Sequence, residues 1–186
     1  MEALIASTLA VALAEIGDKT QLLSLFLAAR FANRWGILAG ITVATLINHG
    51  LSAWLGAWAA GWMPDGVMKW VVALSFMAIA VWVLIPDRDS EGESPMLRYG
   101  AFLAATVLFF IAEIGDKTQV ATVVLAARFD AAVEMVIIGT TLGMLIANAP
   151  VVWAGAWLMS RLPLHWTRRA AFVLFLLFGV AALVAW

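Results

Sequence analysis

The 186-residue sequence contains no cysteine, few charged residues and no excess of basic residues. The absence of cysteine excludes disulfide bonds, thiolate nucleophiles, iron–sulfur clusters and cysteine-ligated zinc. Charged residues make up 12% of the chain, which is about half of their share in a soluble domain. The formal net charge of −1 offers no basic surface for a nucleic acid. The sequence therefore predicts neither a water-soluble domain nor a nucleic-acid-binding protein.

Hydrophobic residues form 65% of the chain, and its mean hydropathy is +0.99. A helix needs about 20 apolar residues to cross the hydrocarbon core of a bilayer. Six stretches approach or exceed that length, and short segments rich in charged and turn residues separate them. We therefore expect an all-α polytopic membrane protein with six transmembrane helices in the lipid bilayer. The six stretches are residues 3–29, 35–60, 67–85, 99–127, 134–159 and 167–186.

One eight-residue segment occurs twice. Residues 14–21 and 112–119 both read A-E-I-G-D-K-T-Q, and the similarity continues along their flanks. Each half of the chain holds three predicted spans, so the second half enters the membrane from the opposite side. Inverted repeats of this kind place a substrate site near the midplane, where the repeats meet. We expect a first three-helix repeat at 1–86, an acidic cytoplasmic linker at 87–97 and a second, inverted repeat at 98–186.

Basic residues are distributed unevenly between the two predicted sides of the membrane. The loops after the first, third and fifth spans carry seven arginines, whereas the opposite side has only Lys69 and Arg128. By the positive-inside rule, the arginine-rich side is cytoplasmic and both termini lie outside the cytoplasm. The seven residues are Arg30, Arg34, Arg88, Arg98, Arg161, Arg168 and Arg169.

Each copy of the repeated segment places three charged residues in the middle of a predicted span. A charged group at the centre of a membrane helix costs about 2.5–3.5 kcal/mol, so six of them need partners or water. At about 100° per residue, Glu15, Asp18 and Lys19 share one face of a continuous helix. Gly17 and Gly115 allow another backbone to come close, or allow the helix to loosen and present carbonyl groups. The second copy supplies Glu113, Asp116 and Lys117.

Together the two motifs carry a formal charge of −2, which matches one divalent cation or two protons. An oxygen-rich set of ligands suits hard cations such as Mn²⁺, Ca²⁺ or Mg²⁺. The alternative is a structural role, with a Glu15–Lys19 pair inside one helix and Asp18 bonded to a neighbouring helix. The predicted metal ligands are Glu15, Asp18, Glu113 and Asp116. The predicted supporting residues nearby are Lys19, Lys117, Gln21, Gln119, Ser24 and Thr122.

The second and fifth predicted spans also carry polar residues. Asn48 and His49 lie on or beside a polar stripe of the second span, and the repeat places Asn148 at the position equivalent to His49. We expect these residues to line a pathway or to support the ligands. The alternative is hydrogen bonding between helices, which contributes about 0.6 kcal/mol per bond.

The doubled E-x-G-D-K-T motif, on the first and fourth of six spans, resembles the small cation/proton exchanger family. That family includes bacterial manganese exporters of the MneA type and the Golgi Mn²⁺/Ca²⁺ antiporters of eukaryotes. The resemblance covers essentially the whole chain, with no departure inside either motif, and implies a bacterial inner (plasma) membrane protein. It assigns one half of the ion site to Glu15, Gly17, Asp18, Lys19 and Thr20, and the other half to Glu113, Gly115, Asp116, Lys117 and Thr118.

We therefore expect a secondary active transporter, not an enzyme, that exports Mn²⁺ or Ca²⁺ in exchange for protons. No permanently bound cofactor is expected, and a homodimer is compatible with the sequence. The first alternative is a passive divalent-cation channel or importer. A second is an intramembrane aspartyl hydrolase that uses Asp18 and Asp116 as a catalytic dyad. A third is a helix-bundle scaffold that binds no ion.

Overall fold

The computed structural model describes residues 1–85, 95–159 and 164–184, and the regular secondary structure in these ranges is helical. Most of the predicted acidic linker, residues 87–94, lies outside the described residues. Short 3-10 helices occur at Pro95–Tyr99 and Asp130–Ala132. The α-helices in these ranges are α1 (Glu2–Glu15), α2 (Lys19–Arg30), α3 (Arg34–Ala60), α4 (Asp65–Val83), α5 (Ala101–Glu113), α6 (Lys117–Arg128), α7 (Val133–Met159) and α8 (Leu164–Val184).

The order and the lengths of the helices recur in the two halves of the chain. The short helices α1 and α2 have 14 and 12 residues, and their counterparts α5 and α6 have 13 and 12. The long helices α3 and α7 both have 27 residues, while α4 has 19 and α8 has 21. Each half thus consists of two short helices followed by two long ones.

The described part of the chain is helical and has the apolar character of an integral membrane protein. Four segments in the described part of the chain are long and apolar enough to cross a membrane, namely Arg34–Ala60, Gly66–Val83, Asp130–Gly155 and His165–Val184. Large apolar side chains also cover the outer surface, and on α3 the side chains of Leu51, Trp54 and Trp58 are each more than half exposed. Contiguous apolar surface of this kind is unfavourable in water and suits contact with lipid.

The first and fourth predicted spans are not continuous helices. Residues 3–29 are divided into α1 and α2, and residues 99–127 are divided into α5 and α6. The expectation that Glu15, Asp18 and Lys19 share one face of a single helix is therefore wrong. The physical reason is that Gly17 and Gly115 adopt φ angles of 83° and 74°, which take the backbone out of the helix.

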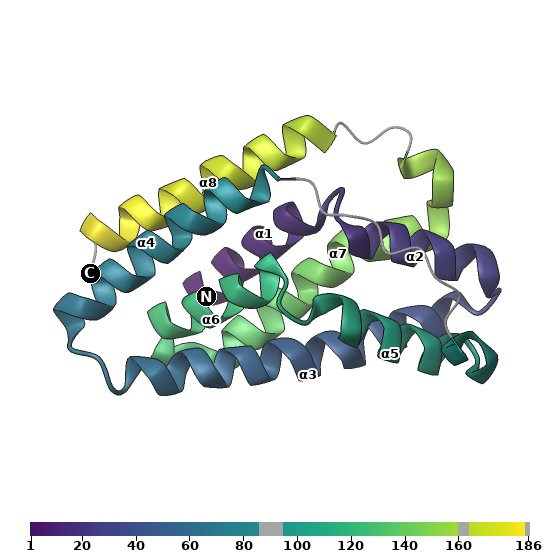
Figure 1. Ribbon diagram of the computed structural model, residues 1–186, viewed down its shortest axis with the longest axis horizontal. Coiled ribbons are helices and arrows are strands. Elements are labelled where there is room, and N and C mark those ends of the chain that lie inside the picture. The colour runs from purple at the N-terminus through teal and green to yellow at the C-terminus, as the bar shows by residue number, and fades with distance from the viewer. Residues whose placement is uncertain (86–94, 160–163, 185–186) are drawn as a thin grey trace.

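The helices pack in layers (Figure 1). Helices α4 and α8 lie side by side along one edge, where Phe76 stacks on Phe175 with ring centroids 6.2 Å apart. Helices α3 and α5 pack together along the opposite edge, and α1 packs against α7 between these two layers. As a result, the charged residues that flank the two breaks, Glu15, Asp18, Glu113 and Asp116, are buried, whereas Ile114 and Gly115 of the second break are exposed.

Equivalent contacts in the two halves differ strongly. Gly56 of α3 lies so close to α6 that a Cβ atom there would stand 2.1 Å from the carbonyl oxygen of Val123. The repeat makes Gly155 of α7 equivalent to Gly56, and Leu25 of α2 equivalent to Val123. A Cβ atom at Gly155 would stand 3.8 Å from the Leu25 side chain, and α7 leaves helical geometry there, with φ 57° and ψ −143°. The same contact is therefore overly tight for a side chain in one half and leaves room for ordinary van der Waals contact in the other.

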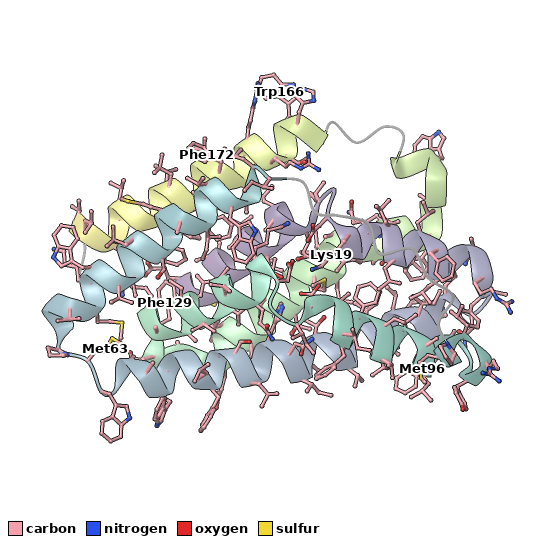
Figure 2. All side chains as sticks on the ribbon, in the orientation of Figure 1. Lys19, Met63, Met96, Phe129, Trp166 and Phe172 are labelled. Atoms are coloured by element: carbon pink, nitrogen blue, oxygen red, sulfur yellow. The ribbon has the colours of Figure 1, made fainter. Side chains whose placement is uncertain are left out.

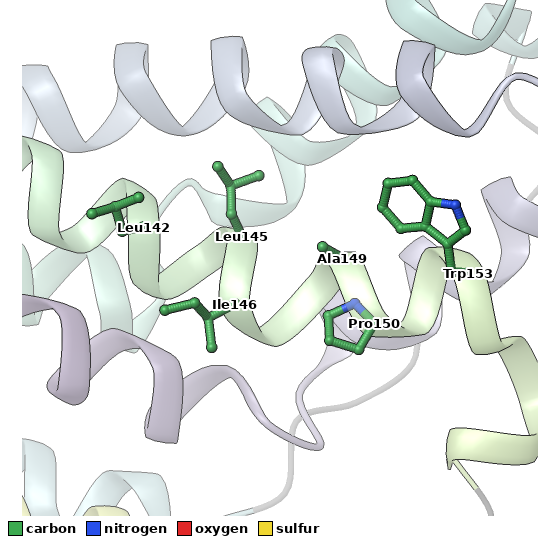
Figure 3. A pocket seen from close by; sticks show the side chains of 6 residues that line it. All are labelled: Leu142, Leu145, Ile146, Ala149, Pro150 and Trp153. Carbon is green, nitrogen blue, oxygen red and sulfur yellow. The ribbon is translucent and has the colours of Figure 1, made fainter.

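A shallow groove of about 480 Å³ runs along α7 (Figure 3). All the residues that line it are apolar, so it provides no polar ligand for a cation. The lining residues are Leu142, Leu145, Ile146, Ala149, Pro150 and Trp153.

Candidate cation site

The repeated segment produces the same backbone break in each half. Glu15 is the last residue of α1, Gly17 has a positive φ angle, and Asp18 is the N-cap of α2. Ile16 has φ −67° and ψ 114°, and the equivalent Ile114 has φ −60° and ψ 119°. Because Gly is the common residue after a helix end and Asp is a favoured N-cap, the identical sequences stop and restart a helix in the same way.

A glutamine side chain stabilises the backbone conformation of each break through hydrogen bonds. The side-chain oxygen of Gln21 accepts a hydrogen bond of 2.8 Å from the backbone N–H of Gly17. Gln119 accepts the equivalent bond from Gly115 at 2.7 Å. Gln21 also donates to the carbonyl oxygen of Ala147 on α7 at 2.7 Å. The bonds from Gly17 and Gly115 satisfy backbone groups that a broken helix leaves without partners, and the bond to Ala147 connects the first break to α7.

The break brings helix ends and carboxylates together inside the bundle. Glu15 and Glu113 end α1 and α5, whose last carbonyl groups carry partial negative charge. Asp18 and Asp116 begin α2 and α6, whose first N–H groups carry partial positive charge that favours a carboxylate. Discontinuous membrane helices with such ends form the ion and substrate sites of many secondary transporters.

Two ion pairs cross between the halves. Lys19 Nζ lies 2.8 Å from Asp116 Oδ1, and Lys117 Nζ lies 2.9 Å from Asp18 Oδ1. Figure 2 shows Lys19 near the middle of the molecule, among side-chain oxygens. The alternative pairing of Lys19 with Glu15 is therefore wrong, because the helix break turns the lysine toward the other half. The two pairs differ in access to solvent, since the side chain of Lys19 is 24% exposed and that of Lys117 only 4%.

Three of the four predicted metal ligands lie together. Glu15, Glu113 and Asp116 each offer an oxygen, and these oxygens lie within 4.8 Å of one another. Both glutamates are completely buried. The fourth predicted ligand, Asp18, is outside this carboxylate cluster and instead pairs with Lys117. Three carboxylate oxygens this close repel one another unless a cation or protons lie between them.

The glutamates are only partly satisfied by hydrogen bonds. The Thr20 hydroxyl donates to Glu15 Oε2, and the Thr118 hydroxyl donates to Glu113 Oε2 at 3.0 Å. The second oxygen of each glutamate, Oε1, is buried and has no hydrogen-bond partner among the described residues. Leaving a buried carboxylate oxygen unpaired is unfavourable. The donor set therefore fits a divalent cation that prefers oxygen ligands.

The predicted supporting residues form contacts around this cluster. The Ser24 hydroxyl donates to Asn148 Oδ1 at 2.7 Å, which connects α2 to α7. Asn48 donates to the carbonyl oxygen of Phe110 at 3.0 Å, which connects α3 to α5. The Thr122 hydroxyl donates within α6, to the carbonyl oxygen of Thr118. The backbone acceptors in these bonds have no signature in the sequence, because any residue can supply a carbonyl group.

We expect removal of one partner of the buried ion pair to destabilise the protein. Lys117→Gln leaves the Asp18 carboxylate buried without its cation, which costs about 3–5 kcal/mol. The double variant Asp18→Asn/Lys117→Gln removes both charges and should recover most of that loss. Thermal unfolding of the detergent-solubilised proteins measures both effects, with Lys69→Gln as the control for a lysine outside the pair. Equal stability of the single variant and the wild type would contradict this role of the pair.

A buried carboxylate cluster at the ends of broken membrane helices is the kind of site that secondary cation transporters use. The chain belongs to the family described as divalent cation/proton antiporter GDT1, which it matches over residues 3–91 and 101–186.

Relatives of the chain occur in bacteria and plants. It is 49% identical, over 97% of its length and 90% of the relative's, to a protein of Vibrio cholerae named "Putative manganese exporter". It is 27% identical to GDT1-like protein sll0615 of Synechocystis, over 98% of this chain and 97% of that protein. It is 28% identical to GDT1-like protein 5 of Arabidopsis thaliana, over 92% and 91% of the two chains. No solved structure matches the chain.

Proposed function

We propose that this protein exports a divalent cation, with Mn²⁺ as the principal substrate, from the cytoplasm in exchange for protons. The observation that carries the proposal is the buried cluster of Glu15, Glu113 and Asp116 oxygens within 4.8 Å of one another. Membership of a divalent cation/proton antiporter family supports it, as does the 49% identity to a relative whose name refers to manganese export. On this view the chain is a transporter rather than an enzyme.

Glu15, Glu113 and Asp116 hold the cation in this proposal. Asp18 and the two lysines set the charge of the site, because four carboxylates and two ammonium groups leave two negative charges. A divalent cation neutralises those charges, and two protons do the same once it has left. The site is therefore neutral in both loaded states. One chain contains every member of the site, so the proposal requires no second copy.

The membrane potential favours exchange over simple conduction. Moving two positive charges outward against about 100 mV, negative inside, costs about 4.6 kcal/mol. An uncoupled pore would consequently let the cation flow into the cell. Entry of two protons for each cation that leaves cancels this cost, since no net charge crosses the membrane.

In the proposed topology, α1 with α2 and α5 with α6 each count as one span. With α3, α4, α7 and α8 they give six spans in two inverted repeats. The arginine-rich loops are cytoplasmic, and both termini lie on the opposite side of the inner membrane, outside the cytoplasm. Helix α2 then runs from the site toward the cytoplasm, and α6 runs from the site toward the exterior. The opposite orientations of the two three-span repeats provide the symmetry that alternating access uses.

The unequal halves support this mechanism. On the α6 side, Gly56 packs directly on the backbone of Val123, and Lys117 is buried. On the α2 side, the equivalent contact at Gly155 is looser, and Lys19 is partly exposed. In the proposed topology this conformation is closed toward the exterior and open toward the cytoplasm. If the contact on the α2 side became tight and the contact on the α6 side became loose, the site would open toward the exterior.

Transport by the purified protein in proteoliposomes tests the proposal. We expect an imposed pH gradient to drive Mn²⁺ flux, with protons moving in the opposite direction. Ca²⁺ and Mg²⁺ are compared under the same gradient, and protein-free liposomes serve as the control. Collapsing the gradient with a protonophore at zero membrane potential should stop accumulation of Mn²⁺. A Mn²⁺ flux that neither moves protons nor responds to their gradient would instead indicate a passive channel.

A further inference from the structure

His49 of α3 is a buried imidazole without a hydrogen-bond partner among the described residues. Its side chain is completely buried, and neither Nδ1 nor Nε2 forms a hydrogen bond there. Nε2 lies 3.8 Å from Glu113 Oε2, which is too long for a hydrogen bond. Because buried polar atoms nearly always have a partner, an imidazole with two unpaired nitrogens requires an explanation.

The surroundings of His49 indicate what its partner is. Glu113 belongs to the carboxylate cluster, and the Oε1 atoms of both Glu113 and Glu15 are unpaired in the described part of the chain. The imidazole therefore lies beside Glu113 at the edge of the carboxylate cluster, outside the three oxygens that lie within 4.8 Å of one another. Nitrogen and carboxylate oxygen together are a common ligand set for a transition-metal ion.

The equivalent residue in the other half behaves differently. Asn148 accepts a hydrogen bond of 2.7 Å from the Ser24 hydroxyl and donates one of 3.1 Å to the carbonyl oxygen of Met144. Its amide is thus satisfied by the protein, although Asn148 is as deeply buried as His49. A polar side chain at this position can be held entirely by its neighbours, and His49 is not. This contrast favours a ligand role for His49 over a packing role.

We propose that His49 is a specificity-determining residue whose Nε2 binds the transported cation beside Glu113. The substrates are then first-row divalent transition-metal ions such as Mn²⁺, in preference to Ca²⁺ and Mg²⁺. This inference rests on the proposed function and names the class of its substrate. All three ions take oxygen ligands, but Mn²⁺ is a transition-metal ion and gains more from an added imidazole nitrogen than Ca²⁺ or Mg²⁺ does. With a proton on Nδ1, the neutral ring presents its Nε2 lone pair to the metal.

Pulsed electron paramagnetic resonance of Mn²⁺ bound to the purified protein tests the ligand directly. We expect echo modulation from a coordinated imidazole ¹⁴N, and we expect ¹⁵N-labelled histidine to change it. His49→Asn should abolish the modulation. His165→Asn should leave it intact, because His165 is exposed and is the other of the two histidines in the chain. The labelled wild type gives an answer even if a variant fails to fold.

Competition in proteoliposomes tests the selectivity. In the wild type, Ca²⁺ in excess should inhibit Mn²⁺ transport weakly. His49→Asn should lower the preference for Mn²⁺ over Ca²⁺ by about tenfold or more, the loss expected when a metal site loses a supporting group. The substitution places at position 49 the residue type that the repeat uses at position 148. His49→Gln serves as a second variant of the same kind.

The outcomes separate this inference from the proposed function. A wild-type protein that transports Mn²⁺ but gives no ¹⁴N modulation would overturn the role of His49 and leave the transport proposal standing. An unchanged preference for Mn²⁺ over Ca²⁺ in an active His49→Asn protein would do the same. A wild-type protein that neither binds nor transports Mn²⁺ would overturn both.

Discussion

Replacing Glu113 with glutamine should abolish cation transport, with a fall in rate of at least about 100-fold. Glutamine keeps the size of the side chain and can still accept the hydrogen bond from Thr118. It removes the negative charge that a cation needs and the group that takes up a proton after the cation has left. Both steps of the exchange therefore fail, while the packing of the buried site changes little.

Glu15→Gln should have the same effect, since Glu15 is equally buried and receives the equivalent hydrogen bond from Thr20. The measurements are Mn²⁺ flux in proteoliposomes and growth of cells in excess Mn²⁺. Glu134→Gln is the matched control, because Glu134 lies in the exposed first turn of α7. Full Mn²⁺ resistance in cells that depend on either cluster variant would contradict the assignment of the ligands.

Adding one methyl group at Gly56 should lower the transport rate by about tenfold to a hundredfold. In the observed conformation a Cβ atom there would stand 2.1 Å from the carbonyl oxygen of Val123, so α3 and α6 would have to separate. Overpacking of this kind costs about 1–3 kcal/mol, and each 1.4 kcal/mol corresponds to a factor of ten. The substitution therefore disfavours the state in which the α6 side is closed.

The control for this prediction lies on the same helix. A Cβ atom at Gly50 would meet nothing within 4 Å, so Gly50→Ala should transport at the wild-type rate. Gly155→Ala should also impair transport, because φ 57° is strongly unfavourable for alanine. Proteoliposome flux is measured for all three variants after circular dichroism has confirmed equal helix content. A wild-type rate for Gly56→Ala would show that the tight contact at Val123 is not part of the transport cycle.

Local features of the sequence predicted several of the residues that the structure brings together in the candidate site. Burying a charged side chain in a membrane is unfavourable, so the positions of Glu15 and Glu113 indicated a functional role. The duplication indicated that the two residues act together. The Gly-Asp pair in each motif also carries the signals of a helix end and a new N-cap, although the surrounding hydropathy favours an unbroken span. The prediction of continuous helices was wrong because a hydropathy window averages over the two or three residues that break the helix.

The sequence by itself determined that the chain is helical, that it lies in a membrane and that it buries two copies of one acidic motif. These properties depend on composition and short-range spacing. Only the tertiary structure decided that Lys19 pairs with Asp116 rather than Glu15. It also decided that, among the described residues, the nitrogens of His49 have no hydrogen-bond partner while the amide of Asn148 has several. The physical reason is that two identical segments favour the same local conformation, so the sequence gives no ground for different partners in the two halves. Their partners and their exposure depend on how segments nearly 100 residues apart pack against each other.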